Sequence, residues 1–412
     1  MSLEVRAIRD DELVDWVAAM HLAFHVNRSA AEEAEFRRTA RNQDLARSLA
    51  AFDDGRVVGS YLSFPTELTL PGTDARVLSD AVTAVSVVPT HHRRGLLTRM
   101  LRADLEASRE RGEVASALIA AEYPIYGRFG FGAAVHQASY RLQTNLTRFV
   151  REPRGSVELV DPSHMRSVAP GVFDAVRRAR PGQIGRTSVY WDMRVGIMRA
   201  PWNAGQSQLH HAVYQPPDGT PTGYVLYRTE GDWQHHVPTG RLSIEELIAA
   251  DADAYLGLWR YCAEVDLVGE VTAEMRPTSE PLEWLLYDGR KALQQTIRTD
   301  FLWVRPLDTP KFLAARRYVA EDQLTLEVDD PLGMAGGRYS LEGGPQGATC
   351  QPSERSADLH LGISALSALS LGGVHPGVLA MAGLIDELTP GSLDRAARLF
   401  VWPVTPWCST FF

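Results

Sequence analysis

Apolar residues recur along the chain with two spacings, one typical of strands and one typical of helices. The change is sharpest after residue 84, where three valines in residues 85–88 predict a buried strand that Pro89 ends. Apolar positions then recur every three to four residues, which predicts a helix with one buried face. These positions are Leu96, Leu97, Met100, Leu101 and Leu105. A cation followed by a glycine, Arg111 and Gly112, ends the helix.

The first 150 residues contain further segments of both kinds. Helical spacing covers residues 13–24 and 29–49. The strand-like stretches are residues 4–9, 56–64, 77–82, 115–121 and 135–140. Their order is strand, two helices, antiparallel strands and then strand, helix, strand. We expect this order to form one domain over residues 1–150.

The middle of the chain, residues 151–300, repeats part of that order. Two alternating stretches, 211–214 and 223–227, bracket a Pro-Asp-Gly turn and predict a hairpin. Residues 242–265 are predicted to be rich in helix, and 270–274 to form a strand. No basic glycine turn accompanies these elements. We therefore expect a second domain of the same kind without a phosphate-binding turn.

The last segment, residues 301–412, has a different order of elements. A strand over 301–306 is followed by a predicted helix over 311–318. Three alternating stretches then predict half-buried strands, and helical pieces continue from Ile363 to about Phe400. These strand stretches are residues 324–328, 337–341 and 357–361. The chain is thus predicted to be α/β (α+β), with three domains.

Composition narrows the class of protein. The 412 residues are 45% hydrophobic and 23% charged, which is typical of a soluble protein with two or three domains. No apolar run approaches twenty residues, and no signal peptide opens the chain, so we expect a cytoplasmic protein. Three distant cysteines suit a reducing compartment and predict neither a disulfide framework nor a metal site. The net charge of −9 argues against nucleic acid and mildly favours a cationic substrate.

The turn between the strand at 85–88 and the helix from Leu96 is a candidate anion site. Backbone N–H groups of a first helical turn have no partner within the helix, and Arg93 and Arg94 add positive charge beside them. These features suit a pyrophosphate. The alternative is a solvated basic turn. The sequence matches neither the GxxxxGK[ST] nucleotide loop nor the GxGxxG dinucleotide fingerprint.

The same turn resembles the acyl-CoA turn of the GCN5-related N-acetyltransferases, Q/R-x-x-G-x-G/A. The six positions are residues 92–97; the central Gly95 matches, whereas His92 and Leu97 differ from the consensus. The stretch 87–97, the sequence IYGRFGFG at 125–132 and the last residue are similar to the Eis (enhanced intracellular survival) family. That resemblance implies tandem acetyltransferase (GNAT-like) domains, the second without an acyl-CoA site, followed by a sterol-carrier-protein-like domain. It also implies a homohexamer.

The resemblance implies acetyl-CoA as co-substrate and no metal. The strand would present backbone groups to the pantetheine arm and polarise the thioester carbonyl, and the helix start would hold the pyrophosphate. The expected cofactor-binding residues are Val85, Ser86, Val87, Arg93, Arg94, Gly95, Leu96, Leu97, Thr98, Ala121 and Glu122. For each valine alone, packing in the core is the alternative interpretation.

Two residues are expected to move protons. The resemblance assigns Tyr126 as the acid that protonates the leaving sulfur, and a phenol with a pKa of about 10 carries its proton at neutral pH. The alternative is a tyrosine that only packs at a strand end. No Glu or His of the first domain is spaced to act as the base, and the resemblance offers the terminal carboxylate of Phe412 instead. A frayed terminus is the alternative, but residues 401–412 hold two tryptophans and two prolines, which predicts a buried tail.

The acceptor is a primary amine, with lysine-type, polyamine and aminoglycoside-like compounds as open choices. The expected pocket residues are Phe24, His25, Phe36 and Phe411. Aromatic residues at these places predict a more apolar pocket than in the family members that acetylate aminoglycosides. A different class of function also stays open: a lipid- or ligand-binding protein that uses acetyltransferase domains as scaffolds.

Overall fold

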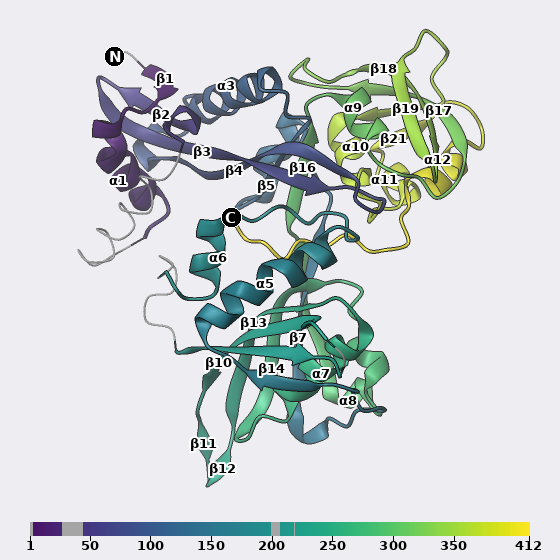
Figure 1. The fold of residues 1–412 in the computed structure, drawn as a ribbon. Coiled ribbons are helices and arrows are strands. Elements are labelled where there is room, and N and C mark those ends of the chain that lie inside the picture. Colours follow the sequence, from purple (N-terminus) through teal and green to yellow (C-terminus); the bar gives the residue numbers. More distant parts are fainter. Residues whose placement is uncertain (1–2, 27–43, 199–206, 218) are drawn as a thin grey trace.

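Three large β-sheets organise the computed structural model, which describes residues 3–26, 44–198, 207–217 and 219–412. Two sheets have seven strands and one has five, and a two-stranded ribbon, β11 (Trp233–Gln234) with β12 (Val237–Pro238), projects from the second sheet. In Figure 1 the first and third sheets lie side by side above the second. The chain end lies between the first sheet and α6.

The first sheet takes its strands from two distant parts of the chain. Its order is β1 (Leu3–Ala7), β2 (Ser48–Asp53), β3 (Arg56–Thr69), β4 (Arg76–Val87), β5 (Ala115–Ile119), β16 (Leu302–Pro306) and β6 (Gly132–Ala133). The helices α1 (Leu13–Ala23) and α3 (Leu96–Glu110) cover it. The buried face of α3, with Met100, Leu101 and Leu105 fully enclosed, packs into the same core as Trp16 and Tyr61.

One predicted helix of this domain is wrong at its end. Residues 29–43 of the predicted helix 29–49 lie outside the described residues. Leu45–Arg47 form a 3-10 turn and Ser48 begins β2. The reason is Arg47, whose guanidinium is buried against the carboxylates of Asp80 and Glu113, so the chain must leave helical geometry to enter the sheet. The predicted strands 77–82 and 85–88 are one strand, β4, with an irregular step at Ala84, where φ is +51°.

The second sheet repeats the plan of the first. Its order is β15 (Leu293–Asp300), β7 (His136–Gln143), β14 (Val268–Pro277), β13 (Gly240–Ala249), β10 (Gly223–Glu230), β9 (Leu209–Gln215) and β8 (Ser156–Leu159). Its helices are α5 (Pro162–Arg177), α6 (Ser188–Arg194), α7 (Ala252–Ala263) and α8 (Gly289–Ala292). As with β4 and β5, the central strands β13 and β14 run parallel and are joined by a helix, here α7.

The predicted helix-rich stretch 242–265 is half wrong, because residues 242–249 belong to β13 and only Ala252–Ala263 are helical. The buried positions of β13 include Leu242, Ile244 and Glu246, two residues apart. A glutamate at a buried position hides this alternation in the sequence.

The first two sheets exchange strands. β7 lies within the predicted first segment, residues 1–150, yet it pairs with β14 and β15 of the second sheet. In return β16, which begins the predicted third segment, pairs with β5 and β6 of the first sheet. The sheets therefore do not divide at the predicted boundaries 1–150, 151–300 and 301–412. The chain therefore passes between the two sheets twice, from β6 to β7 and back from β15 to β16.

The third sheet has the order β19 (Gly347–Pro352), β18 (Gly337–Gly344), β17 (Asp322–Asp329), β20 (Leu359–Gly362) and β21 (Ile385–Glu387). Its helices are α9 (Thr309–Ala314), α10 (Ile363–Leu369), α11 (Pro376–Met381) and α12 (Ser392–Phe400). The predicted helix 311–318 ends early because buried Arg316 donates to the carbonyls of Ser370 and Phe400, which pulls the chain inward. In the described part of the chain, no helix combines the length and apolarity needed to cross a membrane.

Candidate functional site

The first sheet opens at the end of β4. The parallel pairing of β4 with β5 stops at Val82 and Leu118, whereas β4 continues to Val87. The N–H of Val88 donates to the carbonyl of Val58 in β3 at 2.9 Å. Because backbone groups alternate along a strand, those of Val87 face the open side, where the carbonyl of Val87 lies 2.8 Å from Nε2 of His92. Val85, Ser86 and Val87 thus lie where an extended ligand can add to the sheet.

The predicted anion turn directly follows this opening. A short 3-10 turn (Pro89–His91) leads to Arg93 with φ of +60° and to Gly95 with φ of +74°, which is the residue before α3. A Cβ at Gly95 would meet no atom within 4 Å, so the glycine is required by its backbone angle and not by crowding. The N–H groups of Leu96, Leu97 and Thr98, in the first turn of α3, face out of the helix.

One carboxylate orders this basic turn. Asp53, the last residue of β2, lies 3.0 Å from Nε2 of His91 and 3.8 Å from Nη1 of Arg94. Nη2 of Arg94 also donates to the carbonyl of Thr90 at 3.3 Å. The side chain of Arg93 has neither a hydrogen bond nor an ion pair to any described residue. In this turn the guanidinium of Arg94 is therefore held by the protein, whereas that of Arg93 is available to bind an anion beside the free N–H groups.

Tyr126 lies in the first domain, in the single turn α4 (Tyr123–Tyr126) that follows β5. Ala121 and Glu122 form the link between β5 and α4. Burial, and then the negative charge of Glu122, raises the pKa of the Tyr126 hydroxyl to about 12. Only 6% of the residue is exposed, and its ring meets the edge of Phe131. Within the described residues its hydroxyl has no hydrogen-bond partner, so its proton is free to be donated elsewhere.

The C-terminal tail returns to the first sheet. The ring of Phe412 packs on Phe64 of β3, and Phe64 pairs with Ala81, the residue before β4 and β5 part. Trp407, Cys408, Ser409 and Thr410 are buried, which confirms that part of the predicted tail is enclosed. Figure 1 shows the tail, in yellow, running between the first and second sheets.

Of the predicted acceptor residues that the structure describes, Phe411 lines a pocket that Phe24 and His25 do not. Phe411 is 56% exposed and lines a pocket on the second domain. Its other lining residues are Tyr190, Met193, Arg194, Leu209, Arg228 and Glu245. Phe24 and His25 follow α1 on the first domain and do not line this pocket, and Phe36 lies outside the described residues.

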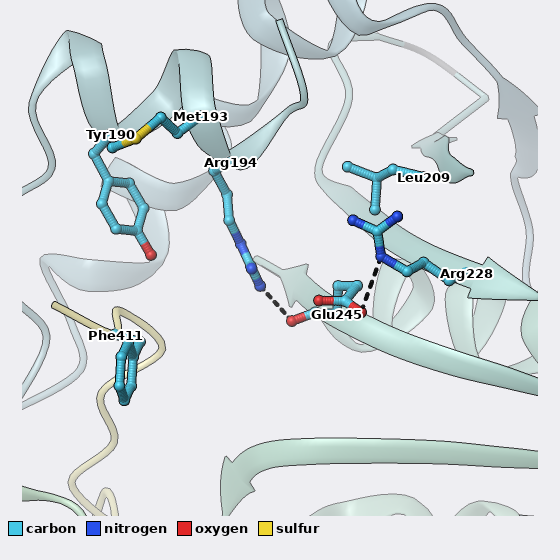
Figure 2. Close-up of a pocket in the computed structure, with 7 residues that line it drawn as sticks. All are labelled: Tyr190, Met193, Arg194, Leu209, Arg228, Glu245 and Phe411. Carbon is cyan, nitrogen blue, oxygen red and sulfur yellow. Dashed lines mark hydrogen bonds and ion pairs between the residues drawn. The ribbon is translucent and has the colours of Figure 1, made fainter. Parts of the chain in front are cut away.

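That pocket carries charge as well as aromatic rings. In Figure 2 the rings of Tyr190 and Phe411 stand on one side, while Arg194 and Arg228 both point toward Glu245. Nε of Arg228 lies 3.3 Å from a carboxylate oxygen of Glu245, and Arg194 donates to the backbone carbonyl of the same residue. The pocket thus combines two aromatic rings with two guanidinium groups and one carboxylate.

Sequence reasoning missed the residues that hold the tail. Arg186 precedes α6 and is fully buried against Glu246 of β13, and Gln183 accepts from the N–H of Ser409 at 3.2 Å. No spacing in the sequence marks these residues, since each contacts a segment more than 50 positions away. The aromatic composition of the tail was the available signal, and it indicates burial without indicating the partner.

A buried carboxylate cluster lies between the first sheet and α3. Asp104 of α3 accepts from the hydroxyls of Tyr61 and Ser63, both at 2.8 Å. Asp80 of β4 accepts from Arg47 at 3.1 Å. Burial, and then the nearby Asp104, raises the pKa of Asp80 well above its usual range. Among the described residues, no group of three or more histidine, cysteine or acidic side chains is arranged to hold a metal ion.

In the second domain, the helix start that corresponds to α3 is already occupied. The carboxylate of Asp251 caps α7 and accepts from the N–H groups of Asp253 and Ala254 at 2.9 and 2.8 Å. Asp253 adds a second negative charge there, paired with Arg151 and Arg154. An anion would be repelled from this helix start.

Comparison with known proteins agrees with this architecture. Residues 4–134 and 182–306 each match a family described as an acetyltransferase (GNAT) domain, and residues 309–409 match a sterol carrier protein domain. These matches confirm the predicted order of two acetyltransferase domains and a sterol-carrier-like domain.

Relatives cover the whole chain. An uncharacterised N-acetyltransferase of Streptomyces avermitilis is 38% identical over 100% of this chain and 99% of its own length. The N-acetyltransferase Eis of Mycobacterium tuberculosis is 33% identical over 84% of this chain and 83% of its own. The crystal structure of Eis1 from Mycobacterium abscessus superposes with a TM-score of 0.84, at 28% identity, over 99% of this chain and 100% of that one. The chain therefore belongs to the Eis family of N-acetyltransferases.

Proposed function

We propose that this chain transfers the acetyl group of acetyl-CoA to a primary amine in the opening of the first sheet. One observation carries the proposal: the end of β4, the basic turn before α3 and the chain end on Phe64 converge on that opening. The strand edge at Val85 to Val87 binds the pantetheine amides. The pyrophosphate binds Arg93, Arg94 and the N–H groups from Gly95 to Thr98. Ala121 and Glu122 border the acyl end.

The reaction exchanges one bond to the acetyl carbon for another. The amine nitrogen bonds to that carbon, and the bond to the thioester sulfur breaks with its electron pair on sulfur. The terminal carboxylate of Phe412 takes the proton of the amine, and the hydroxyl of Tyr126 protonates the leaving thiolate. A Tyr126 phenol with a pKa of about 12 keeps its proton until the thiolate forms. The backbone N–H at the strand edge polarises the carbonyl.

The acceptor belongs to one of three classes, which are lysine-type amines, polyamines and aminoglycoside-like amines. The rings of Tyr190 and Phe411 and the carboxylate of Glu245 offer both an apolar wall and a negative charge to a cationic chain. Phe24, His25 and Phe36 remain candidates for the side of the acceptor site nearer the first domain.

Three further statements belong to the proposal. Only the first domain binds acetyl-CoA, because Asp251 occupies the corresponding helix start in the second. The enzyme works as a homohexamer. It works in the cytoplasm, which suits its three cysteines, all free and buried.

The test measures thiol release from acetyl-CoA with a panel of amines from the three classes, and mass spectrometry identifies the products. An increase of 42 Da (the mass of an added acetyl group) on one class of amine is the expected result. A matched enzyme carrying two extra residues after Phe412 is assayed in parallel. Acetyl-CoA that binds but is not turned over with any amine would contradict the proposal.

A further inference from the structure

The second sheet has an opening that corresponds to the one in the first. The parallel pairs of β13 with β14 stop at Ile244 and Ala273, whereas β13 continues to Ala249. On its other side β14 pairs with β7 from Glu270 to Pro277, with an irregularity between Ala273 and Arg276. Backbone groups of β13 beyond Ile244 are therefore open on the β14 side, as those of β4 are beyond Val82.

This second opening is filled by the protein itself. Nη1 of Arg276 crosses it and donates to the carbonyl of Leu247 in β13 at 2.6 Å. The indole N–H of Trp407, from the C-terminal tail, donates to the carbonyl of Met275 in β14 at 2.7 Å. The guanidinium of Arg276 also lies 5.0 Å from the centre of the Trp407 ring. The place that an acyl-CoA arm would take is thus occupied by an arginine and by the tail.

Arg186 connects the same opening to the end of the tail. Its Nη1 and Nη2 bind both carboxylate oxygens of Glu246, at 3.1 and 2.5 Å, and Glu246 lies in the unpaired part of β13. The remaining donors serve the tail: Nε donates to the Thr410 hydroxyl at 2.9 Å, and Nη2 to the Ser409 carbonyl at 2.9 Å. The guanidinium is stacked at 4.0 Å over the ring of Phe173. The planar guanidinium of Arg186 thus contacts the protein through its edges and through its face. These contacts fix the positions of the N–H groups that bind the tail.

We propose that Arg186 is a positioning residue that sets where the terminal carboxylate of Phe412 lies. The inference rests on the proposed function, in which that carboxylate is the base. Thr410 is two residues from the chain end, so the Cα of Phe412 lies within about 7 Å of the Cα of Thr410, at 3.3–3.6 Å per extended residue. The opening in the second sheet thereby binds the C-terminal tail, and this positions the carboxylate that acts in the first domain.

Energetics favour this role over simple stabilisation. Two buried charges lose their hydration, and an apolar pair of similar volume is often as stable or more so. Burial works to raise the pKa of Glu246, but the charges of Arg186 and Arg194 hold it below its ordinary value, so the pair stays ionised. An apolar pair would not fix the orientation of the tail, because it offers no hydrogen-bond donors to Ser409 and Thr410. Only a planar set of donors binds Ser409 and Thr410 in a single register.

The experiment compares Arg186→Gln and Arg186→Lys with the unaltered enzyme. We expect Arg186→Gln to lower kcat for the amine by about tenfold or more and to leave the KM for acetyl-CoA unchanged. Arg186→Lys keeps the charge without the fork and should restore only part of kcat. Since Arg186→Gln leaves Glu246 buried without its partner, Thr410→Val is a second variant that alters only the tail side. It should move kcat in the same direction.

A readout without catalysis accompanies the kinetics. Carboxypeptidase digestion, followed by chromatography of free phenylalanine, should release Phe412 several times faster from Arg186→Gln and Thr410→Val than from the unaltered enzyme. Arg166→Gln is the matched control, because Arg166 pairs with Asp192 of α6 in the same domain and donates nothing to the tail. It should change neither kcat nor the rate of release.

The outcomes separate the inference from the proposed function. If two residues added after Phe412 leave kcat unchanged, the terminal base is wrong. If that extension lowers kcat, but Thr410→Val and a folded Arg186→Gln change neither kcat nor the release of Phe412, the positioning role of Arg186 is overturned. If the terminal base and the positioning role are both correct, Arg186→Gln should lower kcat little further in the extended enzyme. The reason is that the substitution and the extension act on the same carboxylate.

Discussion

The ring of Phe412, the last residue of the chain, meets the ring of Phe64 in β3 edge to face, with centroids 5.7 Å apart and planes at 85°. Residues 348 positions apart in the chain are thus in contact at the place where the first sheet opens. An aromatic pair of this geometry contributes about 0.5–1.5 kcal/mol beyond the area it buries. That is enough to hold the last residue in place in a tail already fixed at Thr410.

The first prediction follows from this pair. Phe64→Ala should lower kcat by about fivefold to tenfold and leave acetyl-CoA affinity unchanged, because about 1 kcal/mol of restraint on Phe412 is lost. Steady-state kinetics with both substrates measure the two effects separately. Val57→Ala, at a buried position of the same strand seven residues from Phe64, is the control for a cavity in β3. Equal losses in kcat for both variants would count against the Phe64 contact.

The second prediction concerns the basic turn. Replacing Arg93 and Arg94 by glutamate should weaken acetyl-CoA binding at least about tenfold, because each charge-assisted hydrogen bond to phosphate contributes about 1.5–3 kcal/mol. Isothermal calorimetry measures the affinity directly. Arg102→Glu, on the exposed side of α3, makes a charge change of the same kind away from the turn and should have little effect. An unchanged affinity in the folded double variant would place the pyrophosphate elsewhere.

The third prediction concerns Tyr126. Tyr126→Phe should lower kcat by about 10²-fold, the lower end of the effect of a positioned proton donor. The thermal midpoint should hardly change, because the ring stays and the hydroxyl bonds no described residue. Because the pKa of Tyr126 is raised to about 12, its ionisation should not lower the activity of the unaltered enzyme below about pH 10. A loss of activity between pH 8 and 9 that disappears in Tyr126→Phe would refute the raised pKa.

The fourth prediction concerns pH and stability. An unfolded aspartate has a pKa of about 3.9, and the pKa of buried Asp80 is raised above that by burial and Asp104. Between those two pKa values the folded state binds a proton that the unfolded state has lost. Stability therefore falls as pH rises through that window. Asp80→Asn, which resembles the protonated acid, should flatten this fall; thermal midpoints from pH 4 upward measure it, and parallel curves would show that Asp80 does not carry the proton.

The fifth prediction concerns assembly. Sedimentation velocity at micromolar concentration should show a hexamer. Several large apolar side chains of the third domain lie exposed near one another in sequence, including Met381 at 91% and Val378 at 63%. Met381→Glu tests whether α11 is part of an interface, and a hexamer that survives this change would exclude α11. A monomer for the unaltered chain would reject the closed assembly altogether.

Local features were predictable from the sequence, and partners distant along the chain were not. The stretch from Val85 to Leu105 alternates, turns and then repeats with helical spacing, so the strand, turn and α3 follow from neighbours alone. The beginning of β2 was missed, because Arg47 looks like a polar helical position until Asp80 and Glu113 surround it.

The candidate site divides in the same way. The basic turn was predictable from Arg93, Arg94 and Gly95. The position of the tail was not, because Arg186 and Glu246 look like ordinary surface charges in the sequence and are buried by segments far away along the chain. The exchange of β7 and β16 between the two sheets could not be predicted either. The alternation of apolar residues in a strand does not indicate which sheet the strand joins.

The exchange of β7 and β16 has a consequence for how the protein is made. On the ribosome, residues 1–133 emerge with every strand of the first sheet except β16, so β5 has an unpaired edge until Pro306 has been synthesised. At about 5–20 residues per second, the 173 residues from Ala133 to Pro306 take roughly 10–35 s. During that time the nascent first domain is open at the strand next to the proposed acetyl-CoA site. Acetyl-CoA binding should therefore appear only after the second domain has been translated.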